Sequence, residues 1–339
     1  MTRRAHRLIR FALALIVGGV TLGLGPNAVG ATGAPTYAHL LSWLETPIDA
    51  RSAGMGSADA GLADGPAGHY SNPAGLALLT DGRFSSSYRA MEFGRSLSYA
   101  GVTAPVRGEA SLTFSWLYAG YGTVETRDNS GVTNGEVIGQ NEHQFSVTFA
   151  KRFSRRVGMG FKVNYYHTKL DVLTSNSVTL DAGAMLFLDH FLYDRETIGA
   201  AKVRDFRVGV ALRSIGSTFK MNTAKYWAGQ SLEPRGVDVE QRAPISGVAG
   251  VSARFLNQKL LGAAEIEGHE TYGMRLRAGA EYQIATALAI RLGMNRTALT
   301  AGAGFDFTAV GKNLGLDYAF QGDRVEEGSE HVISFRVEF

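Results

Sequence analysis

Residues 50–58 read Ala-Arg-Ser-Ala-Gly-Met-Gly-Ser-Ala, and residues 69–76 read His-Tyr-Ser-Asn-Pro-Ala-Gly-Leu. Small residues dominate residues 51–79, so this backbone can lie close against another surface, and its glycines permit a positive φ where the path requires one. Pro73 fixes its own φ and biases Asn72 towards extended geometry. The segment is therefore predicted to be neither a helix nor a ladder strand, but a compact plug packed inside another structure.

The same segment resembles the N-terminal signature of the PorV/PorQ family, outer-membrane barrels related to the long-chain fatty-acid transporter FadL. In that family Ala-Arg-x-x-Gly-Met-Gly is followed by Leu-Ala-Asp and then by Asn-Pro-Ala-Gly-Leu, and this chain has these elements in the same order. The family often has an aromatic residue directly before Asn-Pro, where this chain has Ser71. The resemblance implies a plug or hatch motif made of Arg51, Gly54, Met55, Gly56, Asp64, Asn72, Pro73, Ala74 and Gly75.

These glycines have two other interpretations. A dinucleotide-binding fingerprint would place its third glycine where the chain has Asp59, and no strand-then-helix pattern surrounds the segment. A glycine-rich surface loop without a function remains the alternative to a plug.

Residues 1–31 have the features of an export signal. Four arginines precede an apolar run at 11–24, and small residues follow it. This predicts a cleaved secretory signal peptide, with a retained anchor helix as the alternative, although the run is short for a membrane span. We accordingly predict a signal peptide at 1–31, an N-terminal plug or hatch segment at 32–80 and an outer-membrane barrel at 81–339.

The charge balance changes once the signal is removed. The formal net charge of +3 includes those four arginines, and residues 1–31 contain no Asp or Glu, so the remaining chain carries −1. Nothing in this balance attracts nucleic acid. The chain has no cysteine, which excludes disulfides and thiolate metal sites.

Beyond the plug, apolar and polar residues alternate in short segments separated by turn residues. Such a period of two is typical of strands with one lipid-facing and one lumen-facing side. The pattern predicts an all-β fold, a transmembrane antiparallel β-barrel of about fourteen strands. The expected strands are 83–91, 95–106, 109–119, 141–152, 155–168, 177–189, 203–215, 243–254, 257–268, 272–283, 285–295, 298–309, 312–321 and 330–339.

The connections favour a barrel over a large soluble sandwich. Turns after even-numbered strands are mostly short, apart from 190–202, whereas long loops are expected at 121–140 and 216–242. This asymmetry is typical of outer-membrane barrels, with short periplasmic turns and longer outer loops. The last residues alternate and end on Phe339, which resembles the C-terminal insertion signal read by the barrel-assembly machinery.

Charged residues of both signs fall on the expected lumen face. They form a hydrogen-bonded ladder in one interpretation and a polar track for a permeating solute in the other. We favour the ladder, because mixed charges pair with one another. The residues are Glu265, Glu267, Arg275, Arg277, Glu281 and Arg291.

The long loop at 216–242 carries aromatic residues and methionine. Such residues in an outer loop can form a partner surface, or they can pack over the barrel mouth. The residues in question are Phe219, Met221, Tyr226 and Trp227.

No catalytic pattern accompanies these features. The histidines lack ligand spacing, and there is no nucleophile elbow or phosphate-binding loop, so we expect no enzyme activity, no cofactor and no metal site. Two functions remain: the resemblance implies an accessory of type IX protein secretion that handles exported proteins, and the alternative is a FadL-like channel for hydrophobic small molecules. A barrel with only a structural role is a third. The expected partners are outer-membrane lipid, the barrel-assembly machinery, secreted proteins or secretion components, and hydrophobic small molecules, but no nucleic acid.

Overall fold

The protein is described from a computed structural model. The predicted signal peptide lies outside the described residues. Those residues are 43, 46–128, 130–189, 203–224, 236–270, 273–296, 298–322 and 328–339.

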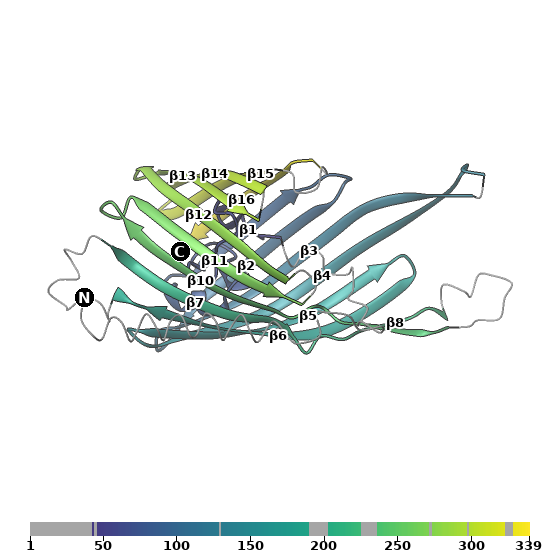
Figure 1. Cartoon of the computed structure of the whole chain (residues 1–339), viewed down its shortest axis with the longest axis horizontal. Coiled ribbons are helices and arrows are strands. Elements are labelled where there is room, and N and C mark those ends of the chain that lie inside the picture. Colours follow the sequence, from purple (N-terminus) through teal and green to yellow (C-terminus); the bar gives the residue numbers. More distant parts are fainter. Residues whose placement is uncertain are drawn as a thin grey trace.

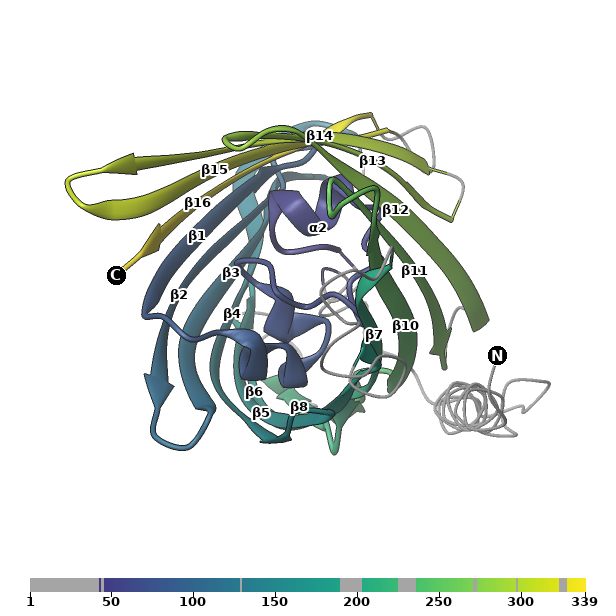
Figure 2. The ribbon, with the colours of Figure 1, turned by 90° about the vertical axis from the view of Figure 1, so that its left-hand side faces the viewer.

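Fourteen antiparallel strands of the described chain form one closed barrel (Figures 1 and 2). The first strand, β1, pairs with β2 on one side and with the last strand, β16, on the other. The predicted fold class is thereby confirmed. The wall consists of β1 Arg83–Ala90, β2 Ser96–Val106, β3 Ala110–Arg127, β4 Thr133–Ser154, β5 Val157–Leu170, β6 Leu173–Phe187, β7 Arg204–Ile215, β10 Ser246–Phe255, β11 Leu260–His269, β12 Gly273–Ala285, β13 Leu288–Asn295, β14 Ala298–Ala309, β15 Lys312–Gln321 and β16 Glu330–Glu338.

Side chains alternate between the lumen and the outer surface. On β5, Val163 and Tyr165 are exposed on the outside, whereas Asn164 and Tyr166 are buried inside. The outer rows of the wall are largely apolar, and a continuous apolar surface of this kind is stable against hydrocarbon. Polar residues inside the wall are buried by one another and by the N-terminal segment.

The expected loop at 121–140 is wrong, because most of it is a β-hairpin. The ends of β3 and β4 pair with each other through Val124↔Ile138, beyond the last rungs that they share with β2 and β5. Asp128 Oδ1 accepts hydrogen bonds from two backbone N–H groups of the tip, at 2.8 and 2.9 Å. Figure 1 shows this hairpin projecting from the barrel at the opposite end from the C-terminus.

A second small sheet lies within the long connection between β7 and β10. Its strands are β8 Phe219–Asn222 and β9 Asp238–Gln241, which pair antiparallel. The period-two pattern does not predict these strands, because each contains only four residues.

Residues 46–79, called the plug below, lie inside the ring of strands (Figure 2). They include α2 Ala50–Gly54 and the 3-10 helices η2 Gly68–Tyr70 and η3 Pro73–Leu78, so the expectation of no helix is wrong for these short turns. Asp49 caps α2 by accepting from the Ser52 N–H, since a carboxylate at this position satisfies a free helix donor.

None of the helices in the described part of the chain is long and apolar enough to cross a membrane.

Candidate functional site

The wall has glycines where the plug crosses it. Three cross-strand pairs of glycine facing glycine lie under the plug: Gly160↔Gly183, Gly209↔Gly250 and Gly279↔Gly293. At each of these six positions a Cβ would come within about 3 Å of a plug atom; at Gly209 it would lie 1.8 Å from the Ala60 carbonyl oxygen. The plug backbone therefore lies directly on the wall, which only residues without a side chain permit.

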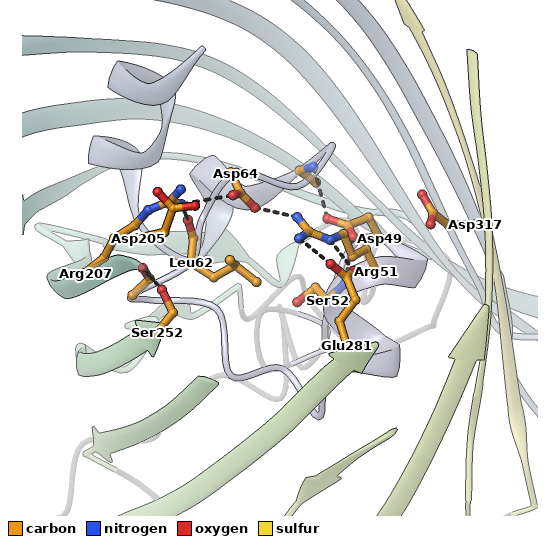
Figure 3. A network of polar contacts seen from close by, with 12 residues as sticks. Asp49, Arg51, Ser52, Leu62, Asp64, Asp205, Arg207, Ser252, Glu281 and Asp317 are labelled. Atoms are coloured by element: carbon orange, nitrogen blue, oxygen red, sulfur yellow. Dashed lines mark hydrogen bonds and ion pairs between the residues drawn. The ribbon is translucent and has the colours of Figure 1, made fainter. Parts of the chain in front are cut away.

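Arg51 lies at the centre of the polar contacts between plug and wall (Figure 3). Its Nε donates to Glu281 Oε2 at 2.9 Å, its Nη2 to Glu281 Oε1 at 3.1 Å, and its Nη1 pairs with Asp64. Asp64 also pairs with Arg207 of β7 at 2.9 Å. Arg51 thus joins α2 directly to Glu281 of β12 and, through Asp64, to Arg207 of β7.

Asp64 is ionised in this arrangement. Burial by itself would raise the pKa of its carboxyl group, but the guanidinium groups of Arg51 and Arg207 hold that pKa well below its usual range. A carboxylate with two such partners is stabilised in its charged form.

The six predicted ladder residues face the lumen in two groups. Glu281 and Arg291 pair at 2.7 Å, and Arg291 also reaches Asp317 at 2.6 Å. Arg277 pairs with Glu265 at 2.6 Å and with Glu267, and Arg275 lies 3.9 Å from Glu267. The structure adds members that sequence reasoning missed: Asp317, Arg207 and Arg213, the last pairing with Glu267.

Glu265 connects the second group to the plug. Its Oε2 accepts hydrogen bonds from the backbone N–H groups of Asp59 and Ala60, at 2.9 and 2.7 Å. The ladder therefore does two things: its charges compensate one another, and its carboxylates anchor the plug backbone.

The second half of the plug motif forms a local turn against β5 and β6. Asn72 Nδ2 donates to the carbonyls of Ala60 and Ala184, at 2.9 and 3.2 Å, and its Oδ1 accepts from the Ala74 N–H at 3.0 Å. Pro73 lies over Gly160, and a Cβ on Gly75 would lie 2.1 Å from the Ala63 carbonyl oxygen.

The first half of the motif fits the wall equally closely. Gly56 has a φ of +65°, and a Cβ there would lie 2.5 Å from the Ala278 carbonyl oxygen. A Cβ on Gly54 would touch Arg291 at 3.3 Å. Met55 is fully buried in a cluster with Leu62 and Leu261.

An apolar, aromatic cluster lies inside the barrel beside the plug. Tyr166 of β5 is 6.2 Å from Trp43 and 5.8 Å from Phe219 between ring centroids. Plug residue Tyr70 packs edge-on against Tyr99 at 5.7 Å. We call this group the lumen cluster; it comprises Trp43, Ile48, Ala67, Tyr70, Leu97, Tyr99, Leu117, Ala119, Tyr166, Phe219, Met221 and Ala243.

The predicted partner surface on the long loop is wrong for two of its residues. Phe219 and Met221 are buried in the lumen cluster, because β8 turns this face inward against β6 and β5. Tyr226 and Trp227 lie outside the described residues.

A buried lysine supports η2 from the wall. The ammonium group of Lys162 is 2.9 Å from Asp181 and 3.9 Å from the centre of the Tyr70 ring, a cation–π contact. The neighbouring His69 lies 3.3 Å from Ser115 Oγ. Burial, helped by the Lys162 charge, lowers the pKa of His69 well below its usual value, so its imidazole is neutral.

Phe339 is the last residue and its ring is largely exposed on the outer surface. Its N–H donates to the Gly82 carbonyl at 2.9 Å, and Lys312 lies 5.6 Å from its ring centroid.

Within the described residues no group of three His, Cys, Asp or Glu side chains could hold a metal ion.

No protein-family model matches the chain, and no curated protein matches it. Solved structures do match its fold. The toluene transporter TodX of Pseudomonas putida is 13% identical with a TM-score of 0.55, over 85% of this chain and 96% of TodX. A FadL homologue of Pseudomonas aeruginosa is 10% identical (TM-score 0.57; 86% and 98%), and the toluene transporter TbuX of Ralstonia pickettii is 15% identical (0.56; 86% and 97%). At these identities the match concerns architecture, and the chain has the fold of the FadL-like outer-membrane barrels.

Proposed function

We propose that the protein is a bacterial outer-membrane channel for hydrophobic small molecules, closed by its plug. The apolar outer surface suits a membrane location, and a cleaved signal peptide at 1–31 would supply export. Three similar structures are described as transporters of toluene or as a FadL homologue. The secretion accessory implied by the PorV/PorQ resemblance becomes the second candidate.

The lumen cluster is the observation that carries this proposal. The lumen of a water-filled pore is polar, whereas here twelve buried apolar residues gather inside the barrel. Apolar and aromatic side chains are what the binding site of a hydrophobic ligand requires. Ile48, Ala67 and Tyr70 of the plug belong to the cluster, so a solute that reaches it would contact the wall and the plug together.

The plug would act as the hatch below this site. Several of its contacts with the wall are hydrogen bonds and ion pairs, which can be exchanged for water one by one. Tyr70 links the plug to the lumen cluster, because this plug residue packs against Tyr99 of β2. A ligand that displaces Tyr70 would loosen the plug from that side.

Uptake of radiolabelled toluene by cells lacking their own transporter tests the proposal. We expect uptake above that of cells without the protein, and a clear loss for Tyr166→Asn, which places a polar amide in the lumen cluster. Tyr282→Asn is the matched control, because Tyr282 is on the outer surface.

Equal uptake with and without the protein would refute the channel proposal. So would an equal effect of the two tyrosine variants at matched outer-membrane levels, because membrane damage would then explain both.

One observation favours the second candidate. Among the described residues, the projecting β3–β4 hairpin pairs only with itself beyond Gly120 of β3 and Gly139 of β4, so both of its edges are open there for a partner strand. An accessory of type IX secretion could use it to receive exported proteins. A genome that encodes neither type IX machinery nor proteins with the matching C-terminal sorting domain would remove this candidate.

A further inference from the structure

The outer face of β2–β5 contains a hollow of about 460 Å³. It lies over Ala100, whose cross-strand neighbours are Ser86 and Trp116. The small side chain of Ala100 leaves a depression, and larger apolar side chains form its rim. The rim includes Phe84, Val102, Phe114, Phe145, Val147 and Tyr165.

The hollow belongs to the outer surface and is separate from the lumen. Exposed fractions of 58% for Phe114 and 51% for Phe145 show that these rings face outward. Below the hollow the wall is continuous, since Ala100, Trp116, Phe145 and Tyr165 are consecutive partners across β2–β5. A molecule in the hollow therefore comes from the surrounding membrane.

The polarity of the outer face rises in steps towards the loop end. The rung Trp116↔Phe145↔Tyr165 borders the hollow, and the next outward-facing rung is Tyr118↔His143↔His167. The rung after that contains Asn141 paired with Lys169. Towards the loop end, a rung of apolar rings is thus followed by a rung with imidazole N–H groups and then by a rung with an ammonium group.

Hydrogen bonds orient the two imidazoles. Trp116 Nε1 donates to His143 Nδ1 at 3.2 Å, so the proton of a neutral His143 is on Nε2, where it is a donor. His167 Nδ1 lies 2.8 Å from Asn176 Oδ1, an acceptor, which assigns a proton to Nδ1. The Tyr118 ring packs against His143 at 5.1 Å between centroids and limits its rotation.

We propose that this face is a binding site for one membrane lipid with a phosphate headgroup. An acyl chain fills the hollow over Ala100, while the phosphate accepts from His143 Nε2 and faces the Lys169 ammonium. The acyl chain of the lipid then lies against the apolar rungs, and its anionic phosphate lies against the rungs that carry His143 and Lys169. The inference rests on the membrane location proposed above but on neither transport function.

Native mass spectrometry of the full chain in detergent tests it, by titration with dioleoylphosphatidylglycerol. We expect one lipid to bind in preference to further ones. Ala100→Leu fills the hollow and should weaken that first binding step about tenfold. Ala303→Leu is the matched control, because Ala303 is a small outward residue on β14, away from the hollow.

The headgroup is tested separately. His143→Ala combined with Lys169→Ala should weaken phosphatidylglycerol but leave dioleoylglycerol, which has the same chains and no phosphate, unchanged. Equal affinities for Ala100→Leu and Ala303→Leu would overturn the site, as would equal binding of the two lipids by the wild type. Toluene uptake by Ala100→Leu should stay normal. The uptake assay therefore tests the channel proposal, and the lipid titration tests the lipid site independently.

Discussion

At the residue scale, the absence of side chains on the wall decides where the plug can lie. Three glycine pairs in register leave backbone exposed towards the lumen, and atoms of the plug occupy the space. A glycine in a strand is otherwise unfavourable, because it loses more conformational entropy on folding than other residues and has no side chain to pack. Its presence at these positions is explained by the close approach of a second backbone.

Gly209→Ala should displace the plug without opening the wall. The new Cβ would lie 1.8 Å from the Ala60 carbonyl oxygen, a clash that costs about 1–3 kcal/mol of plug docking. We expect higher single-channel conductance in planar bilayers. Gly262→Ala is the control, since a Cβ there would meet only a ring atom at 3.6 Å; equal conductance for both variants would contradict the close contact.

Arg51→Gln should loosen the plug by removing its central cation. The substitution leaves Asp64 with Arg207 and Glu281 with Arg291, so each carboxylate keeps one partner. Removing one member of a buried pair costs about 3–5 kcal/mol when nothing compensates it, and we expect less than that here.

The readout for Arg51→Gln is Trp43 fluorescence during urea titration. Trp43 is buried and donates to Glu142 Oε2 at 2.7 Å, so its emission should shift to the red when the plug leaves. Arg127→Gln on the projecting hairpin is the control, and an unchanged urea midpoint for Arg51→Gln would count against its central place.

The pKa of His69 predicts an effect of acid on the plug. This pKa is lower in the docked plug than the value of about 6.5 expected after release. The released state therefore binds the proton more readily, and the docking free energy is complete above about pH 6.5 and falls as the pH is lowered. Asp59 acts in the opposite direction, because burial raises the pKa of its carboxyl group in the docked state.

The contribution of His69 is measured as the difference in pH-dependent conductance between the wild type and His69→Asn. We expect conductance to increase more between pH 8 and about pH 5 in the wild type than in His69→Asn, which cannot titrate. The docked environment of His69 contains Lys162, Tyr70 and Ser115. An identical pH profile of the two proteins would mean that His69 is not shielded by the plug.

At the element scale, the β3–β4 hairpin separates the two candidate functions. In the part of the chain that the structure describes, its outer part pairs only with itself and adds no rung to the closed wall. The hairpin is long, whereas the turns at the other end of the barrel are short. This difference is typical of outer-membrane barrels, which have long loops at one end and short turns at the other.

Deletion of residues 123–138 should leave heat-modifiable gel migration, the mark of a folded barrel, unchanged. Under the channel proposal toluene uptake also persists, whereas under the secretion candidate the delivery of exported proteins is lost. Val147→Pro is the control for a broken wall, because proline removes a ladder hydrogen bond in a central strand. Loss of the folded form on hairpin deletion would show that the hairpin is part of the barrel's own stability.

At the scale of the whole molecule, wall and plug are held by different kinds of contact. The wall strands bond to one another, and the lumen charges retain wall partners such as Arg277 for Glu265. The plug, in contrast, has short helical turns and depends on the wall for its packing.

Deletion of residues 51–79 should therefore yield an intact barrel with a wide pore. We expect low single-channel conductance for the wild type and a clear rise for the deletion, with unchanged heat-modifiable migration as the control for folding. Unchanged conductance would place the closure of the lumen elsewhere.

The sequence by itself determined the barrel, because the alternation of apolar and polar residues indicates which side of each strand faces lipid. The predicted strands 298–309 and 312–321 coincide with β14 and β15. The same alternation predicted six charged residues on the lumen face, and all six are buried there.

Only the tertiary structure decided what lies opposite what. Period two assigns Glu281 to the lumen but cannot say that Arg51, 230 residues earlier, binds it. The same holds for the glycine pairs, whose register depends on closing the whole barrel, and for Phe219, which a four-residue strand turns inward. Contacts between distant segments depend on register and closure, and these are properties of the folded chain that no local pattern contains.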